Sequence, residues 1–226
     1  MSLFAKFVAA TLIVMPIAVF ADKDKDCKDQ KKIKQPLSAT GQTGCWDVNG
    51  TAIPCAYTGQ DGELQAGAVL SYTDNGDGTL TDNNTGLVWE KKGNDGSIHD
   101  FLTRYSWDQA FSVHVATLNA IRFAGHGDWR LPNVRELQTI VNFASSSPAV
   151  SEAFNTPHCV DGSGVSITEL TGNCTPRQGF YFSSTSRVNG TDSAWSVEVE
   201  SGYSVPIGKS FPWFVRAVRC GFVHDD

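Results

Sequence analysis

The sequence predicts an α+β domain, because three hydrophobic patterns follow one another along the chain. Short β-prone runs separated by Asn-Gly and Asp-Gly dipeptides fill residues 41–89, as in a series of β-hairpins. In residues 106–123 and 133–141 apolar side chains instead recur every three or four positions, which is typical of amphipathic helices. Strand patterns return after residue 143. We therefore expect short twisted antiparallel strands together with two main helices.

Each helix has a recognisable start. Ser106 is the expected N-cap of the first helix, and Asn133 begins the second, with Glu136 as a capping-box partner three residues on. Later in the chain, alternating apolar residues over 195–199 and 203–207 flank a turn and predict a hairpin. The apolar stripe expected along the first helix consists of Trp107, Ala110, Phe111, His114, Leu118 and Ile121.

The composition excludes several classes of protein. Of the 226 residues, 41% are hydrophobic, and 24 Asp and Glu outnumber 18 Lys and Arg, which gives a formal net charge of −6. Proteins that neutralise a nucleic-acid backbone usually carry the opposite charge, so nucleic acid is not an expected partner. Only the N-terminal segment is long and apolar enough to concern a membrane, which excludes a multi-span membrane protein.

The first 21 residues have the pattern of a secretory signal peptide. Lys6 precedes an apolar run over residues 7–20, and Val19 and Ala21 place small side chains at the −3 and −1 positions of a cut after Ala21. The alternative is an uncleaved membrane anchor. With cleavage, we expect an exported protein that keeps no stable membrane span.

Behind the signal peptide we expect two parts. Residues 22–39 form a charged, flexible leader, in which six Lys alternate with four Asp. Because the signs alternate, a solvated leader is favoured over a basic tether for anionic surfaces. Residues 40–226 form a single domain, with an N-terminal hairpin extension over 40–70 and a core over 71–222.

Cysteine usage predicts disulfide staples. The six cysteines, at positions 27, 45, 55, 159, 174 and 220, are an even number in an exported chain, which favours disulfides over metal ligands. They allow 15 connectivities. Asn49-Gly50 suits a two-residue type I′ turn, which would bring Cys45 almost opposite Cys55. Cys159–Cys174 would close a loop rich in Gly, Ser and Thr, and Cys27–Cys220 follows by elimination.

Several motifs occur in an order that resembles a known family. They include the GDWRLPNVREL segment over 127–137 and the TGLVW segment over 85–89. Together with residues 40–45, 55–62, 73–82, 183–185, 194–195 and 215–219, they resemble the Lcl C-terminal domain family. This is the adhesive C-terminal domain of a bacterial collagen-like surface protein and of its exported relatives.

The resemblance implies a C-type-lectin-like fold, which is also similar to formylglycine-generating sulfatase modifiers. It further implies location in the periplasm, on the cell surface or outside a bacterial cell. The characterised relative is a trimeric adhesin that binds glycosaminoglycans, so a homo-oligomer is an open expectation. The present chain differs in lacking a collagen-like Gly-X-Y region. Its residues 36–226 hold 11 Lys and Arg against 20 Asp and Glu, a net of −9, whereas sulfated polymers require clustered cations.

A Gly-rich acidic loop is a candidate calcium site. Asp74, Asp77 and Asp82 could supply oxygen ligands to Ca²⁺, although their spacing does not match an EF-hand. The alternative is a turn in which Gly76 and Gly78 adopt positive φ and the Asp side chains cap the backbone. The chain lacks the EPN, QPD and WND triplets of sugar-binding C-type lectins, and no other cofactor is expected.

Other residues of the family motifs are expected to support the fold. At the junction before the second helix, Trp129 is expected in the core and Arg130 is expected to bind backbone carbonyls and a carboxylate such as Asp128. The structural signature set consists of Asp128, Trp129, Arg130, Pro132, Trp195 and Arg216.

The most binding-like segments are the loop over residues 187–192 and the hairpin near the C-terminus. Aromatic side chains beside polar groups stack on sugar rings or anchor protein partners. The alternative is that these aromatic residues complete a β-core. The candidate ligand-binding residues are Arg187, Asn189, Asp192, Tyr203, Lys209, Phe211 and Trp213.

These observations lead to an exported, non-catalytic binding module that recognises a glycan or a cell-surface or envelope protein, in adhesion or envelope assembly. The Ser-rich segment 183–186 lacks a G-x-S-x-G elbow, and no histidine pairing supports a zinc site. One alternative is a structural subunit of a surface appendage that binds only proteins. A second is an enzyme related to formylglycine generators, which would require reactive cysteines.

Overall fold

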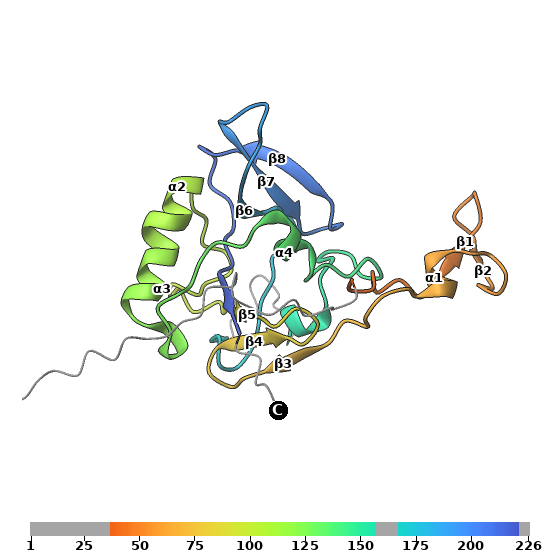
Figure 1. The fold of residues 1–226 in the computed structure, drawn as a ribbon, viewed down its shortest axis with the longest axis horizontal. Coiled ribbons are helices and arrows are strands. Elements are labelled where there is room, and N and C mark those ends of the chain that lie inside the picture. The colour runs from red at the N-terminus through yellow and green to blue at the C-terminus, as the bar shows by residue number, and fades with distance from the viewer. Residues whose placement is uncertain (1–36, 157–166, 222–226) are drawn as a thin grey trace, which may run out of the picture. The chain divides into compact units, whose positions relative to one another are not determined.

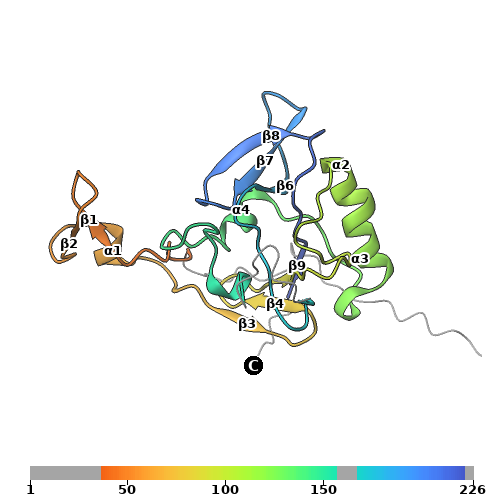
Figure 2. The same ribbon diagram turned by 180° about the vertical axis from the view of Figure 1, so that it is seen from behind.

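The computed structural model describes residues 37–156 and 167–221, and within them the strands form three antiparallel sheets (Figures 1 and 2). This confirms the α+β class. The strands are β1 Cys45–Trp46, β2 Ala52–Ile53, β3 Tyr72–Asp74, β4 Thr79–Asp82, β5 Leu87–Glu90, β6 Phe180–Ser186, β7 Ser193–Glu198, β8 Ser204–Gly208 and β9 Val218–Cys220. The helical segments are α1 Asp61–Leu64, α2 Trp107–Gln109, η2 Ala110–Val115, α3 Ala116–Ala120, η3 Phe123–Gly125, α4 Val134–Gln138 and η4 Glu152–Phe154.

The β1–β2 hairpin confirms the Cys45–Cys55 disulfide and corrects the turn. Cys45 pairs with Ile53 rather than lying opposite Cys55, so the connection between the strands is longer than two residues. The reason is Asp47, whose carboxylate accepts hydrogen bonds from the backbone N–H groups of Asn49 and Thr51 at 2.9 and 2.8 Å. These bonds stabilise an Asx-type loop in place of the expected type I′ turn.

Each of the other two expected disulfides has one cysteine outside the residues that the structure describes. Cys174 and Cys220 are buried and disulfide-bonded, but their expected partners, Cys159 and Cys27, lie outside the described residues. Those two pairings therefore stay predictions, as do the signal peptide and most of the charged leader. Among the described residues, no helix has the length and hydropathy needed to span a membrane.

The four-stranded sheet follows the strand order β3-β4-β5-β9. Its first three strands form the expected hairpin series, and β9 adds the far end of the chain beside β5. The apolar run over 213–219 is regular only at its end, because the residues before β9 form isolated bridges with other segments. Trp89 of β5 and Phe154 of η4 lie in the main core cluster, with rings 6.1 Å apart at nearly right angles.

The first helix begins where the sequence predicts. Ser106 is the N-cap, and its side chain and that of Gln109 form a reciprocal capping box. The helix continues through the π-helical segment η2 into α3 and ends at Ala120, which leaves Ile121 exposed and outside the apolar stripe. A π-helical segment widens the helix locally, and such segments often lie at functional positions.

The second helix, α4, is much shorter than expected. Asn133 and Glu136 form the expected capping box, but α4 has only five residues. Thr139 follows as the C-cap, and Val141 then pairs with Val150 in an isolated bridge. Ile140 and Val141 are therefore buried without being helical, and the described residues form one main helix instead of two.

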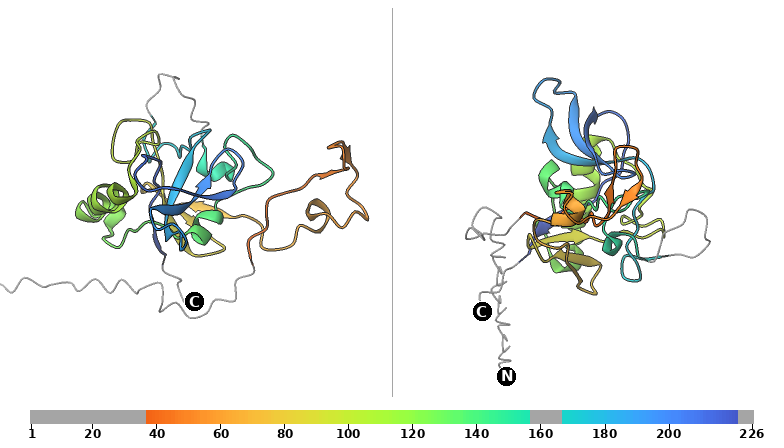
Figure 3. Two further views of the ribbon diagram at one scale, coloured as in Figure 1. Left: turned by 90° about the horizontal axis from the view of Figure 1, so that it is seen from above. Right: turned by 90° about the vertical axis from the view of Figure 1, so that its right-hand side faces the viewer.

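The three-stranded sheet follows the order β6-β7-β8, so β8 lies at an edge, and α4 packs on β6 and β7 (Figure 3). Lys209 and Tyr203 make backbone hydrogen bonds with residues at the two ends of β7. In an antiparallel pair of strands, residue pairs that exchange hydrogen bonds alternate with pairs that do not. Counted from these two bonds, Pro206 belongs to a pair that does not, so its nitrogen points away from β7 toward the outer edge of the sheet. Since proline has no N–H, it prevents a foreign strand from completing its hydrogen bonds there.

Candidate functional site

Two segments far apart in sequence run side by side and create the candidate surface. Tyr105 and Trp213 exchange backbone hydrogen bonds of 2.8 and 2.9 Å, and the Trp107 N–H donates to the carbonyl of Lys209 at 2.9 Å. The start of the main helix is thereby joined to the segment that follows β8. Because these are non-local contacts, neither segment's sequence pattern alone indicates them.

Lys209 holds this surface together. Its Nζ donates to Ser186 Oγ at 2.7 Å and to the Thr191 carbonyl at 2.9 Å. The same ammonium lies 4.0 Å from the centre of the Trp107 ring, within the range of a cation–π interaction. The Trp107 Nε1–H in turn donates to the Ser183 carbonyl at 2.9 Å. Lys209 therefore fixes the 187–192 loop to the helix and has few donors left for a ligand.

The loop over residues 187–192 presents polar side chains. Arg187, Asn189 and Asp192 are all exposed. Gly190 has a φ of 134°, and both Arg187 and Asp192 lie against it, because a Cβ at that position would be 3.6 Å from an atom of each. The loop therefore offers a cation, an amide and a carboxylate close together.

Aromatic side chains belong to the segment that follows β8. Phe211 is 63% exposed, and its ring packs over Gly208, where a Cβ would lie 3.0 Å from the ring. Trp213 is half-buried and packs edge-on against Phe180 at 4.8 Å. The exposed Arg104 places its guanidinium 5.7 Å from the Trp213 ring centre.

We call this surface the aromatic–basic face. It contains six of the seven predicted ligand-binding residues. Tyr203 is separated from the others, because it lies at the opposite end of β8 from Gly208. Sequence reasoning missed Arg104 and Trp107, since Trp107 was assigned to the helix stripe and Arg104 has no distinguishing pattern. The face consists of Arg104, Trp107, Arg187, Asn189, Asp192, Lys209, Phe211 and Trp213.

A second group of charged side chains is buried and was also missed. Glu90 is fully buried, and its Oε1 lies 3.0 Å from Lys92 Nζ and 2.9 Å from His99 Nδ1. Its Oε2 lies 2.9 Å from His114 Nε2 and accepts the Ala217 N–H at 2.9 Å. Burial by itself raises the pKa of a carboxyl, but these neighbours hold the pKa of Glu90 well below its usual range.

Two basic residues of this buried group also have lowered pKa values, for a different reason. Burial lowers the pKa of Lys92 and of His114, and the attraction of Glu90 offsets part of each shift. The Nδ1 atom of His114 has no hydrogen-bond partner, which fits a neutral ring whose Nε2–H donates to Glu90. Clusters with shifted pKa values are often functional. Here every charged group is buried and bonded within the molecule, so we interpret the cluster as support for the fold.

Arg216 joins this cluster to the main core. Its guanidinium donates to the Glu90 and Cys174 carbonyls at 2.9 and 2.6 Å and to Asn173 Oδ1 at 2.6 Å. It also lies 5.3 Å from the centre of the Phe154 ring. The Arg that interrupts the last apolar run therefore connects the segments before β6 to β5.

The remaining signature residues also support the fold, with one correction. Asp128 binds Arg219 Nε at 2.7 Å, whereas Arg130 forms a two-pronged pair with Glu136 at 2.7 and 2.8 Å. The expected pairing of Arg130 with Asp128 is therefore wrong, because the capping residue of α4 lies closer. Trp129 is buried as expected, the Pro132 carbonyl accepts from the Ser184 N–H, and Trp195 is half-buried opposite Pro206.

The three acidic residues of the candidate calcium loop bind separate partners. Asp74 pairs with Lys91 Nζ at 2.7 Å, Asp77 accepts from Thr79, and Asp82 caps the next turn at the other end of β4. These contacts fit the turn interpretation. Within the described residues, no group of three or more His, Cys, Asp or Glu is arranged to hold a metal ion.

The fold and this face are those of a small mixed α+β domain that displays aromatic residues on loops. The family model of the Lcl C-terminal domain matches residues 78–219, which is more than half of the chain. The protein therefore belongs to the Lcl C-terminal domain family, as its motifs indicate. A comparison with curated proteins finds no match. The β1–β2 hairpin and α1 lie outside the family-matched segment.

Proposed function

We propose that this protein is an exported, non-catalytic binding module, which uses the aromatic–basic face to recognise a glycan of the bacterial surface. The observation that carries this proposal is the exposed Phe211 ring, which packs over Gly208. Gly208 pairs with Ser193, and the Lys209 N–H donates to the Asp192 carbonyl, so this ring lies near the end of the polar 187–192 loop. An aromatic ring with neighbouring amide, carboxylate and guanidinium groups suits a sugar, whose apolar ring face stacks while its hydroxyls accept and donate hydrogen bonds.

The rigidity of the face supports recognition. Lys209 connects the loop, the sheet and the helix through three contacts, so the backbone that carries the ligand-facing side chains is positioned before binding. Preorganisation reduces the conformational entropy lost on association and so increases affinity. The C-type-lectin-like fold that family membership implies would suit this use of loops on a stable scaffold.

A non-catalytic role fits the distribution of reactive groups. The acid–base groups with shifted pKa values, Glu90, Lys92 and His114, are buried and bonded to one another. The aromatic–basic face itself contains no His or Cys. Export is proposed from the signal-peptide pattern of residues 1–21 and from the even cysteine count.

An array of glycans and bacterial envelope proteins tests the proposal. The purified exported chain is applied in calcium and again in EDTA, at two salt concentrations. We expect binding to one glycan class that EDTA does not abolish. Loss of binding in EDTA would instead restore the calcium interpretation of Asp74, and strong salt sensitivity on sulfated polymers would identify a glycosaminoglycan. Binding to an envelope protein alone would replace the glycan with a protein ligand.

A further inference from the structure

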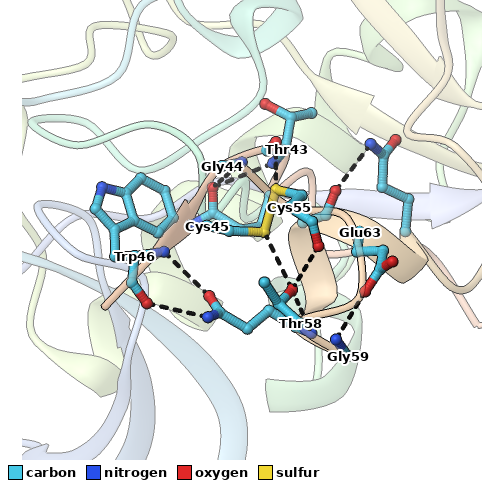
Figure 4. The surroundings of a disulfide bond; sticks show 12 residues. Thr43, Gly44, Cys45, Trp46, Cys55, Thr58, Gly59 and Glu63 are labelled. Atoms are coloured by element: carbon cyan, nitrogen blue, oxygen red, sulfur yellow. Dashed lines mark hydrogen bonds between the residues drawn. A yellow bond between two sulfur atoms is a disulfide. The ribbon is translucent and has the colours of Figure 1, made fainter. Parts of the chain in front are cut away.

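The β1–β2 hairpin and α1 form a compact extension of their own. The Cys45–Cys55 disulfide closes it, and the Gln60 side chain binds both the N–H and the carbonyl of Trp46, at 3.1 and 3.0 Å (Figure 4). Gly62 packs so tightly on the Gly44 carbonyl that a Cβ would lie 2.1 Å away. We call residues 42–66 the hairpin module. The bonds just described join residues of the module to one another.

Within this module, large apolar side chains point to solvent. Val48 and Tyr57 are fully exposed, and Trp46 is 42% exposed. Tyr57 has a φ of 65°, which is uncommon for a residue with a side chain, and the Glu63 carboxylate fixes this turn by accepting the N–H groups of Tyr57 and Gly59 at 2.7 Å each. Aromatic side chains are enriched among the residues that anchor protein interfaces, and here a fixed backbone turn presents one to solvent.

The charges of the two surfaces have opposite sign. The module carries Asp47, Asp61 and Glu63 and no Lys or Arg, and the whole stretch 37–90 lacks a cation while holding seven acidic residues. The aromatic–basic face instead holds Arg104, Arg187 and Lys209 against one acidic residue, Asp192, and exposes the Phe211 ring. An acidic surface with apolar anchors is complementary to a basic surface with exposed aromatic rings.

We propose that the hairpin module of one copy docks on the aromatic–basic face of a second copy. The inference uses the same face as the proposed function, so a bound neighbour would compete with the glycan for it. The two surfaces of the contact differ, which makes it heterologous, and a heterologous contact that does not close into a ring extends into a chain of copies. The module lies outside residues 78–219, which the family model matches.

Complementation between two variants tests the contact. The full chain is exported with its disulfides formed, and its mass is followed by sedimentation over a range of concentrations at low ionic strength. Tyr57→Asn removes the anchor, and Asn accepts a positive φ more readily than Tyr, so the turn stays intact. Arg187→Glu reverses the charge at one position and cancels the net positive charge of the face. Each variant alone is expected to associate at least about tenfold more weakly than the wild type.

A mixture of the two variants distinguishes docking of the module on the face from other modes of self-association. The Tyr57→Asn copy keeps its face and the Arg187→Glu copy keeps its module, so the mixture is expected to form dimers that grow no further. Leu170→Ser, at an exposed apolar residue of another loop, is the matched control and should associate like the wild type. A wild type that stays monomeric, a mixture that stays monomeric or an unaffected Tyr57→Asn would each overturn the inference.

The result is independent of glycan binding. If the variants complement each other while the monomeric chain binds no glycan, the proposed function fails and the self-association stands. If the chain binds a glycan through the face but remains monomeric at every concentration, the self-association fails and the proposed function stands.

Discussion

At the scale of single residues, the most constrained side chain is Glu90. Its two oxygens are surrounded by Lys92, His99, His114 and the Ala217 N–H, so a fully buried carboxylate is left with no unsatisfied oxygen. An ion that is buried with its partners adds little net stability, but it becomes costly once one partner is removed. The cluster therefore makes the packing of β5, the main helix and the segment before β9 mutually dependent.

Glu90→Gln is expected to lower the free energy of unfolding by about 3–5 kcal/mol, because it leaves Lys92 buried with no counter-charge. Urea unfolding followed by tryptophan fluorescence measures the change. Glu152→Gln makes the same chemical replacement at an exposed position and is expected to stay within about 0.5 kcal/mol of the wild type. If both variants changed the free energy of unfolding by the same small amount, the cluster would not couple the packing of β5, the main helix and the segment before β9.

The pH dependence of stability follows from His114. Because burial lowers its pKa in the folded state, the unfolded chain takes up the proton first as the pH falls below about 6.5. The contribution of His114 to the free energy of unfolding is therefore constant above that pH and falls as the solution becomes more acidic. Glu90 adds to this loss at lower pH, because its folded pKa lies below that of the unfolded chain.

Thermal unfolding of the wild type and of His114→Gln between pH 7.5 and 5 checks this expectation. The variant is less stable at neutral pH, yet its melting temperature should depend less on pH over this range, since it has lost one titrating group. A pH dependence identical to that of the wild type would exclude His114 as its source.

At the scale of elements, local signals in the sequence were reliable and long-range ones were absent. The N-caps Ser106 and Asn133, the hairpins of β3–β5 and β7–β8, and the Cys45–Cys55 pair depend on neighbours in the chain and could be predicted. The alignment of residues 104–107 with 209–213 depends on packing between distant segments, which no periodicity records. For the same reason the candidate site was predicted without Arg104 and Trp107.

The errors in individual elements have local physical causes. The prediction of a type I′ turn was wrong because the Asp47 carboxylate accepts hydrogen bonds from the backbone of this loop and stabilises a different conformation. The second helix was overestimated because Ile140 and Val141 continue an apolar pattern although they are buried in non-helical backbone. An apolar pattern indicates which residues are buried, whereas the surrounding structure determines whether those residues are helical.

The hairpin module gives a prediction of its own at this scale. Replacing Cys45 and Cys55 together by Ser removes the restraint on a short loop, worth about 3 kcal/mol in the chain-entropy model. Because the bonds described around the disulfide join residues of the module to one another, we expect protease cleavage within residues 42–66 to accelerate. The main unfolding transition, followed by tryptophan fluorescence, should shift little. A large fall in that transition would mean that the module is part of the folding core.

At the scale of the whole molecule, the protein combines a family domain with an added extension. The family-matched residues 78–219 contain the buried charge cluster and the complete aromatic–basic face. The extension contributes exposed apolar anchors together with acidic side chains. The aromatic–basic face would bind either an external ligand or the hairpin module of a neighbouring copy. Adhesion and self-assembly would therefore compete for the same face.

The measurement that tests the central claim most directly is the affinity of the exported chain for its array-identified ligand, compared between wild type and Phe211→Ser. Phe143→Ser removes an exposed aromatic ring outside the face and serves as the matched control. We predict that Phe211→Ser weakens binding at least about tenfold, as loss of an aromatic anchor does, while Phe143→Ser leaves it unchanged. Equal affinity of all three proteins for the ligand would contradict the assignment of the aromatic–basic face as the binding site.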